Sequence, residues 1–326
     1  MPRRILALSV LAAIALALVA GASARTNSGS ISLVAYSTPR AAYADLIPAF
    51  QKTAGGKDTS FSQSYGASGE QARAVEAGLK ADVVALSLEP DVTALVNKGL
   101  VPRTWKSDKF NGIVTRSVVV FAVRRGNPKK IRDWADLVKP GVQVVTPNVQ
   151  TSGGAKWNIM AAYGAQLRKG KNHTQAVAYL RNLYRHIVSQ DKSAREALQT
   201  FLAGRGDVML AYENEAIFAN QNNQEVPYVI PKATIRIENP IAVTTHSQNK
   251  TTANAFLRYL RTVAAQRIFA QNGYRPVVPA AAKGFSFPVR PQLFTIKWLG
   301  GWAKVDKRFF DPNTGIVTRI QRETGN

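Results

Sequence analysis

The sequence of 326 residues contains no cysteine. This excludes disulfide bonds, a thiol nucleophile and a lipid anchor on a modified N-terminal cysteine. Its three histidines, His173, His186 and His246, lie in unrelated contexts and lack the spacing of a metal site. No Gly-x-Ser-x-Gly segment is present either, so the sequence carries no recognisable enzyme motif, and we expect neither a metal nor a cofactor.

Acidic residues are scarce: 20 Asp and Glu stand against 43 Lys and Arg, a formal net charge of +23. Such a balance favours anionic partners. The basic residues are scattered and are not interleaved with aromatic residues, which argues against nucleic-acid binding. We therefore expect a solvated basic surface that raises the local concentration of small anions. An adhesion or scaffold role has only this surface to support it.

Long apolar runs are missing beyond the N-terminus. Arg3 and Arg4 precede an apolar run at residues 5–20, and Ala22-Ser23-Ala24 follows with a small-x-small pattern. This order is typical of a secretory signal peptide, predicted at residues 1–24. The alternative is an uncleaved N-terminal anchor, although the run is short for a bilayer crossing of about 20 residues. We expect the mature chain to be soluble and to lie in the periplasm or elsewhere outside the cytoplasm.

The remaining chain, about 300 residues, is long enough for two domains. Strands and helices alternate along it, and the order βαβαβ predicts a parallel sheet with helices on both faces. In the first region we expect strands at 31–36, 59–65 and 82–86 and helices at 40–53, 68–80 and 89–98. The pattern restarts with strands at 142–146, 186–189 and 207–212 and helices at 153–168, 175–185, 193–203 and 213–221.

Two long extended segments, 113–124 and 234–243, are candidates to cross between the domains. The predicted fold class is therefore α/β, with two Rossmann-like lobes whose parallel-type sheets are joined by two crossover strands. Residues 30–115 with 241–326 would form the first lobe and 116–240 the second, and the tail from Leu293 would pack back on the first. Ligands in such sheets bind at the carboxyl ends of strands, so the cleft between the lobes is the expected site.

The strongest local signal is the segment 146–158, Thr-Pro-Asn-Val-Gln-Thr-Ser-Gly-Gly-Ala-Lys-Trp-Asn. Ser152 stands at the expected N-cap, and Gly153 and Gly154 let the backbone approach a ligand. The N–H groups at a helix start lack helix partners, which makes an anion site. An ordinary capped helix after a flexible turn is the alternative interpretation. The same order of strand end and helix start recurs at 37–39, 66–71 and 190–195.

This segment resembles the signature of the periplasmic sulfate- and thiosulfate-binding proteins of ABC importers. Further matching motifs are Gly-Ala-Ser-Gly-Glu-Gln-Ala at 66–72, Asp-Trp-Ala-Asp-Leu-Val-Lys-Pro-Gly at 133–141 and Gly-Asp-Val-Met-Leu-Ala-Tyr-Glu-Asn-Glu-Ala at 206–216. The resemblance covers the whole mature chain. It implies a type II periplasmic binding protein, a monomer and not an enzyme, that captures sulfate, or possibly thiosulfate, and delivers it to importer permease subunits.

The resemblance also implies the ligand-binding residues, all of them neutral hydrogen-bond donors. The implied donors are the N–H groups of Ser37, Gly153, Gly154 and Ala194, the Ser68 hydroxyl, both groups of Ser152, and the side chain of Tyr212. Tyr212 stands where the family usually has a tryptophan, and this difference leaves the anion preference open. A site made of donors accepts a fully deprotonated tetrahedral anion and rejects a protonated phosphate. The alternative ligand is another oxyanion such as molybdate or tungstate.

Overall fold

The computed structural model describes residues 29–325. The predicted signal peptide at 1–24 therefore lies outside the described residues. Between residues 29 and 325, every helix is too short or too polar to cross a lipid bilayer.

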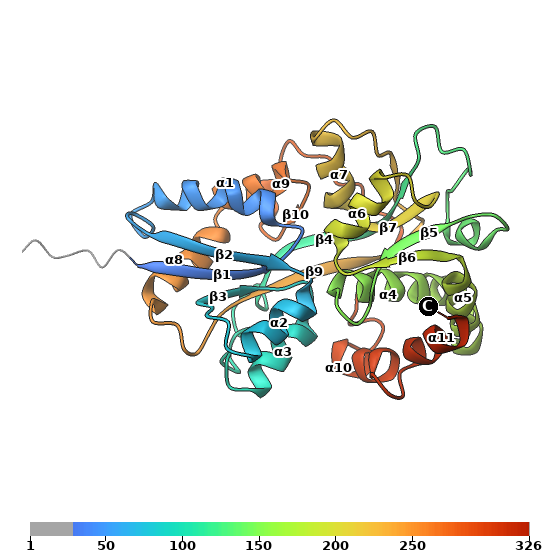
Figure 1. Ribbon diagram of the computed structural model, residues 1–326. Coiled ribbons are helices and arrows are strands. Elements are labelled where there is room, and N and C mark those ends of the chain that lie inside the picture. The colour runs from blue at the N-terminus through green and yellow to red at the C-terminus, as the bar shows by residue number, and fades with distance from the viewer. Residues whose placement is uncertain (1–28, 326) are drawn as a thin grey trace, which may run out of the picture.

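The first lobe is built on three parallel strands, β1 (Ser30–Tyr36), β2 (Ser60–Gly66) and β3 (Val83–Ala85). Ile31, Leu33 and Ala35 face α1 (Arg40–Gln51), α8 (Lys250–Leu260) and α9 (Val263–Gln271). Val34 faces the other way, toward α2 (Ser68–Glu76) and α3 (Glu89–Asn97). This alternation with a period of two buries both faces of the sheet under helices, as Figure 1 shows.

The second lobe repeats the arrangement with β5 (Val144–Pro147), β6 (Ile187–Asp191) and β7 (Val208–Tyr212), which also pair in parallel. Val208 and Leu210 face α4 (Gly153–Arg168) and α5 (His173–His186). Met209 and Ala211 face α6 (Ala194–Leu202) and α7 (Glu213–Gln221). The predicted elements of both lobes are thus present.

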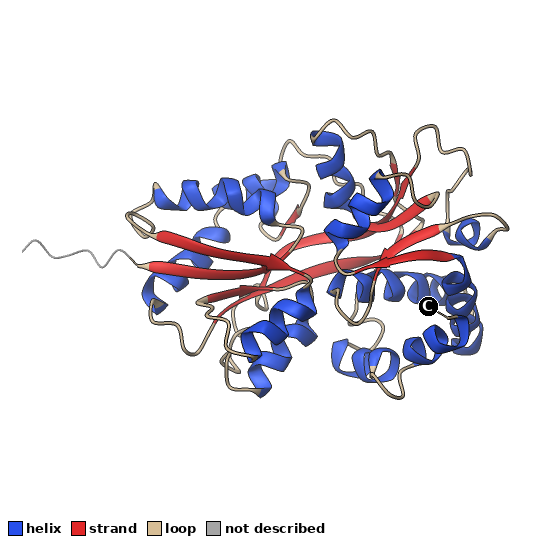
Figure 2. Cartoon of the chain, in the orientation of Figure 1, coloured by secondary structure: helices blue, strands red, loops and turns tan. Residues whose placement is uncertain are grey.

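Two eleven-residue strands, β4 (Ile113–Val123) and β9 (Ala233–Val243), run through both lobes, as predicted. They pair antiparallel with each other, and β9 pairs with β3 while β4 pairs with β7. The strand order is β2-β1-β3-β9-β4-β7-β5-β6, so the sheet is mixed and continuous (Figure 2). Because β3 and β7 are antiparallel to the crossing strands, the carboxyl ends of both parallel sets face the middle of the molecule.

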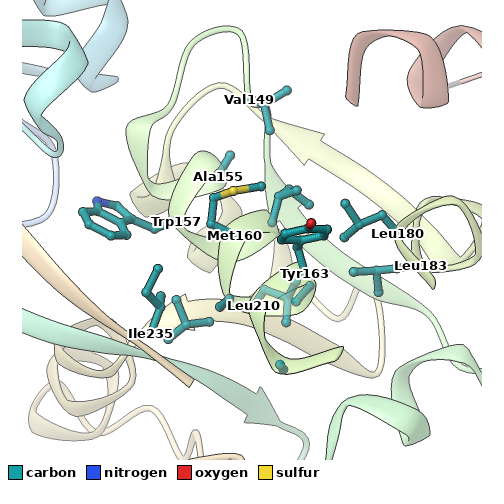
Figure 3. Close-up of a cluster of buried hydrophobic side chains, with 14 of the residues drawn as sticks. Val149, Ala155, Trp157, Met160, Tyr163, Leu180, Leu183, Leu210 and Ile235 are labelled. Atoms are coloured by element: carbon teal, nitrogen blue, oxygen red, sulfur yellow. The ribbon is translucent and has the colours of Figure 1, made fainter. Parts of the chain in front are cut away.

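Helix α4 is buried on nearly every side from Gly153 to Gln166. Figure 3 shows Met160 and Tyr163 of α4 among Leu180 and Leu183 of α5, with Leu210 of β7 also in the cluster. A helix that is enclosed all round has little freedom to shift or rotate. The packing therefore fixes the position of its first residues, which lie at the middle of the sheet.

Most of the C-terminal tail packs on the second lobe and not, as predicted, on the first, although its residues Trp302–Val305 also contact α3. Phe309, Phe310, Val317 and Ile320 belong to the same hydrophobic cluster as Leu180 of α5. The apolar side of α11 (Ile316–Thr324) packs on α5 there, because α5 has an apolar surface that the sheet does not cover. The tail consists of β11 (Gln292–Phe294), α10 (Trp302–Val305), the π-helical turn η3 (Asp306–Phe310) and α11.

Helices α8 and α9 follow each other closely in the sequence. Thr262 separates them, because its hydroxyl caps α9 by accepting from the Ala265 N–H at 3.2 Å. The remaining elements are short. The short elements are η1 (Trp134–Val138), β8 (Tyr228–Val229), β10 (Arg275–Pro276) and η2 (Pro279–Ala282).

Candidate functional site

A small cavity lies where the strand ends of the two lobes meet. Its volume is about 10 Å³, so the lining residues of the two lobes lie close together. Its ten lining residues follow the ends of β1, β2, β3, β5, β6 and β7: Tyr36, Ser37, Thr38, Ala67, Ser68, Ser87, Ser152, Gly154, Ala194 and Tyr212. The parallel pairing within each lobe and the antiparallel crossing strands together bring these six chain segments to one place, although they are up to about 175 residues apart in the sequence.

Six of the seven residues predicted to bind the ligand line this cavity: Ser37, Ser68, Ser152, Gly154, Ala194 and Tyr212. The seventh, Gly153, lies beside it and packs against the first lobe. A Cβ atom on Gly153 would lie 2.4 Å from Leu88 Cδ2 and 2.7 Å from Ser87 Oγ. The absence of a side chain at Gly153 therefore lets the two lobes approach each other.

One of the two donor groups predicted for Ser152 is already engaged within the protein. Its N–H donates to the Asn148 carbonyl at 2.8 Å, so it is already engaged in the loop before α4. Its hydroxyl makes no capping hydrogen bond. Ser193 behaves differently, because its Oγ accepts from the Glu196 N–H at 3.2 Å and caps α6. The Ser152 hydroxyl is thus the group of this residue that remains for a ligand.

Three helices begin at the cavity: α2 at Ser68, α4 at Gly153 and α6 at Ala194. The first N–H groups of a helix have no partner within it, and each helix start carries partial positive charge. A Cβ atom on Gly154 would lie 3.5 Å from both the Ala194 Cβ and the Tyr212 Cε1, so these segments are in close contact. The three helix starts together create a positive potential at the cavity, although no side chain in the lining is cationic.

Tyr212 reaches from the second lobe to the first. Its hydroxyl lies 2.6 Å from the hydroxyl of Ser87, and either oxygen can donate. Burial raises the pKa of the Tyr212 phenol well above its usual value, so the side chain is neutral at physiological pH. Burial raises the pKa of Tyr36 in the same lining as well.

Ser87 is a lining residue that the sequence analysis missed. Its carbonyl accepts from Trp157 Nε1 at 3.0 Å and from Asn239 Nδ2 at 2.9 Å, which ties it to α4 and β9. Its N–H donates to Ser68 Oγ at 2.8 Å. A signal was present in the sequence, since Ser87 follows the third strand and precedes a helix, as Ser37 and Ser68 do after their strands.

Asp91, in the first turn of α3, was also missed. The Ser68 hydroxyl donates to Asp91 Oδ2 at 2.5 Å, so a carboxyl group contacts a lining residue directly. Burial raises the pKa of Asp91, while Lys156, the hydrogen bond from Ser68 and Arg73 act in the opposite direction. Two other acidic residues near the motifs are engaged elsewhere: Glu70 pairs with Lys192 at 3.2 Å, and Asp191 Oδ1 accepts from Thr200 Oγ1 at 2.6 Å.

Further contacts join the lobes around the cavity. The Gly69 N–H donates to the Thr151 carbonyl at 2.9 Å, and Arg195 Nη2 donates to the Thr38 carbonyl at 3.2 Å. Arg195 also forms a bidentate ion pair with Glu215, with distances of 2.9 and 2.8 Å, which neutralises its charge. The structure is therefore a closed form. From residue 29 to residue 325, no group of three or more His, Cys, Asp or Glu residues is placed to hold a metal ion.

The sequence and fold of this chain are similar to those of known binding proteins. The family model of bacterial extracellular solute-binding proteins matches residues 31–275. The chain is 41% identical to the sulfate-binding protein of Synechococcus elongatus, over 97% of this chain and 95% of the relative. It is 36% identical to the thiosulfate-binding protein of Pseudomonas aeruginosa, over 85% and 88% of the two chains.

A solved structure, the sulfate-binding protein SubI from Mycobacterium tuberculosis, shares 44% sequence identity with a TM-score of 0.84. The match covers 87% of this chain and 100% of SubI. A molybdate-binding protein of Mycobacterium bovis is more distant, at 26% identity over 78% of this chain. The chain belongs to the bacterial extracellular solute-binding proteins, in the family of periplasmic sulfate- and thiosulfate-binding proteins of ABC transporters, whose members bind solutes and are not enzymes.

Proposed function

We propose that this chain captures sulfate in the cavity between its lobes. The observation that carries the proposal is the composition of the lining, in which serine, threonine and tyrosine hydroxyls and helix-start N–H groups supply the donors and no side chain is charged. A fully deprotonated tetrahedral anion accepts hydrogen bonds on every oxygen, and such a lining satisfies it from both lobes. Hydrogen phosphate carries a hydrogen that needs an acceptor, and this lining disfavours it.

The donors are sufficient for tight binding. A hydrogen bond to a charged group contributes roughly 1.5–3 kcal/mol, and binding with micromolar affinity requires about 8 kcal/mol. About six such bonds exceed this requirement before the costs of desolvation and lobe closure are subtracted. We therefore expect tight binding even though the Ser152 N–H is engaged with Asn148.

The second candidate ligand is thiosulfate, which the relative from Pseudomonas aeruginosa is named for. Its terminal sulfur is larger than an oxygen and accepts hydrogen bonds more weakly. The small cavity favours sulfate over thiosulfate, and over the larger molybdate and tungstate ions.

The proposed function includes where the chain works and where it delivers the bound anion. We infer that the chain is exported by a signal peptide at residues 1–24, works as a monomer outside the cytoplasm, and delivers sulfate to the permease subunits of an ABC importer. The lobes would open at the crossing strands β4 and β9, with residues 30–115 and 241–291 moving against residues 116–240 and the C-terminal tail. Without Arg3 and Arg4 of the signal peptide, the formal charge of +21 would attract anions toward the cleft.

Calorimetry on protein that has been unfolded and refolded to remove bound anion tests the proposal. We expect sulfate to bind the wild type with one site per chain, and the combined variant Ser152→Ala with Gly153→Asp to lose binding. Ser107→Ala with Gly55→Asp makes the same chemical changes at exposed positions and should bind normally. Sulfate binding of equal affinity in the first variant, with the fold intact by circular dichroism, would overturn the assignment.

A further inference from the structure

Basic side chains gather on the outer side of the C-terminal tail, where α10 and α11 lie against the second lobe (Figure 1). They surround an open hollow of about 570 Å³. Its lining is His173, Lys304, Lys307, Arg308, Thr314, Ile316 and Arg319. The lysine and arginine side chains are exposed, and no Asp or Glu is among these lining residues. The hollow is therefore strongly cationic.

The helical segment formed by α10 and η3 presents three of these basic residues on one side. Val305 and Phe309 are buried in the hydrophobic cluster of the second lobe. Lys304, Lys307 and Arg308 are three and four residues apart, and they line the hollow on the outer side. Burial of the apolar side thus fixes the basic side chains toward solvent.

The carboxylates of the tail are engaged with other groups. Asp306 pairs with Lys156 at 2.6 Å, and Glu323 pairs with Arg181 at 2.7 Å. Asp311 accepts hydrogen bonds from the backbone of its own loop at 2.8 and 2.9 Å. Between residues 29 and 325, no salt bridge involves the basic side chains that line the hollow. Their charge therefore remains available to an anionic partner.

A second hollow, of about 190 Å³, adjoins the first and shares Lys304 and Arg308 with it. Its other lining residues are apolar or aromatic: Tyr163, Leu167, Trp298, Leu299, Val305 and Phe309. Trp298 is 45% exposed, and the Arg168 guanidinium lies 4.5 Å from the centre of its ring. The headgroup layer of a lipid bilayer favours tryptophan, and anionic headgroups attract lysine and arginine.

Together these side chains form one surface, the tail patch, made up of Arg168, Trp298, Lys304, Lys307, Arg308 and Arg319. We propose that the tail patch docks on a lipid surface that carries anionic phosphate headgroups. The basic side chains attract the headgroups, and Trp298 enters the headgroup layer. The first hollow is open, so it cannot strip a small anion of its water as an enclosed cavity does. The inference goes beyond the proposed function, because docking requires no bound sulfate.

Cosedimentation with lipid vesicles tests the proposal on the chain without its predicted signal peptide. Vesicles of phosphatidylglycerol and phosphatidylcholine in equal parts carry the anionic headgroup, and vesicles of phosphatidylcholine alone do not. At about 0.15 M salt we expect the wild type to bind only the first kind. The patch variant, with Lys304→Gln, Lys307→Gln and Arg319→Gln, should bind about 100-fold more weakly, since each basic residue contributes about fivefold.

A matched variant separates the tail patch from the charge of the whole chain. Lys52→Gln, Lys57→Gln and Lys98→Gln remove the same charge at exposed positions of the first lobe. This variant should bind the anionic vesicles nearly as well as the wild type. An equal loss in both variants would show that the chain binds through its overall charge, and would overturn the role of the patch.

The fluorescence of Trp298 gives a second measurement. Its emission should shift to shorter wavelength when anionic vesicles are added, and Trp298→Phe should lose this shift. Trp134, Trp157 and Trp302 are buried, so they should contribute little to it. A shift that persists in Trp298→Phe would contradict the placement of this ring in the headgroup layer.

Two further outcomes would overturn the proposal. The first is failure of the wild type to bind the anionic vesicles. The second is displacement from the vesicles by inorganic phosphate at constant ionic strength, which would make the hollow a site for a small free anion. Sulfate affinity should be unchanged in the patch variant, because no residue of the tail patch lines the cavity between the lobes. A wild type that binds vesicles but not sulfate would overturn the proposed function alone.

Discussion

The Tyr212 hydroxyl at the end of β7 lies 2.6 Å from the Ser87 hydroxyl that follows β3, and this contact joins the two lobes across the cavity. Both side chains are about 99% buried, so each needs the other as a partner. The same two residues line the cavity. This pair of hydroxyl groups therefore contributes both to the contact between the lobes and to the lining of the cavity.

Tyr212→Phe removes one member of this pair and one donor from the cavity. We expect sulfate affinity to fall about tenfold, which corresponds to one hydrogen bond of about 1.4 kcal/mol. Tyr212→Trp restores a donor through its indole N–H and should lose less affinity than Tyr212→Phe. Calorimetry measures both. Tyr228→Phe, in β8 and away from the cavity, is the control, and equal affinities in all four proteins would contradict the role of Tyr212.

Gly153→Ala tests the close approach of the lobes. The added Cβ would lie 2.4 Å from Leu88 Cδ2, so the closed form cannot be reached without a shift. We expect sulfate affinity to fall by about 100-fold or more, or about 2.7 kcal/mol, which lies within the usual cost of overpacking. Small-angle scattering should show a more open average shape in the presence of sulfate.

Gly154→Ala is the matched comparison. Its Cβ would meet Tyr212 and Ala194 at 3.5 Å and Ser152 Oγ at 3.3 Å, which are milder contacts. We expect a smaller loss of affinity than in Gly153→Ala. The reverse order would show that Gly153 does not control closure.

The order of strands and helices, and with it most of the site, could be predicted from the sequence. Ser37, Ser68 and Ser152 each follow a strand, and in a parallel sheet such positions meet at one edge. The groups that were missed depend on side-chain contacts that no local pattern encodes. Asp91 reaches Ser68 from another helix, and the N–H of Ser152 turns out to bond Asn148 within its own loop.

The position of the C-terminal tail could not be predicted for a similar reason. The apolar pattern of α11 shows which of its sides is buried but not which lobe it covers. The structure supplies the answer through Phe309 and Val317, which join the cluster around Leu180 of the second lobe.

Trp302→Ala tests this packing. Trp302 is 4% exposed and meets Trp157 edge to face, with ring centroids 4.7 Å apart. We expect the free energy of unfolding to fall by about 3–5 kcal/mol, measured by urea denaturation. Trp298→Ala removes a tryptophan that is 45% exposed and stacks under Arg168, so it should cost only about 1 kcal/mol. Equal losses would contradict the assignment of the tail.

Arg275→Met tests a buried ion pair between β10 and α7. Arg275 donates to both oxygens of Glu213 at 2.7 and 3.0 Å, and the Glu213 side chain is 1% exposed. Removing the cation leaves a buried carboxylate without its partner, and we expect the free energy of unfolding to fall by about 3–5 kcal/mol near neutral pH.

The loss should depend on pH in a defined direction. Burial already raises the pKa of Glu213, and without Arg275 it rises further. A raised folded-state pKa means that stability is lost as pH rises above the unfolded-state value of about 4.3. The deficit of Arg275→Met relative to the wild type should therefore be smaller at about pH 4 than at about pH 7. The double variant Arg275→Met with Glu213→Gln should recover part of the loss, and a deficit independent of pH would contradict this explanation.

Competition calorimetry with sulfate, thiosulfate, molybdate and phosphate tests the central claim most directly. On refolded protein free of bound anion, we expect sulfate to bind most tightly, thiosulfate and molybdate more weakly, and phosphate at least about 1000-fold more weakly near neutral pH, because its hydrogen finds no acceptor in a lining of donors. Preference for molybdate or thiosulfate over sulfate, or phosphate binding as tight as that of sulfate, would contradict the account.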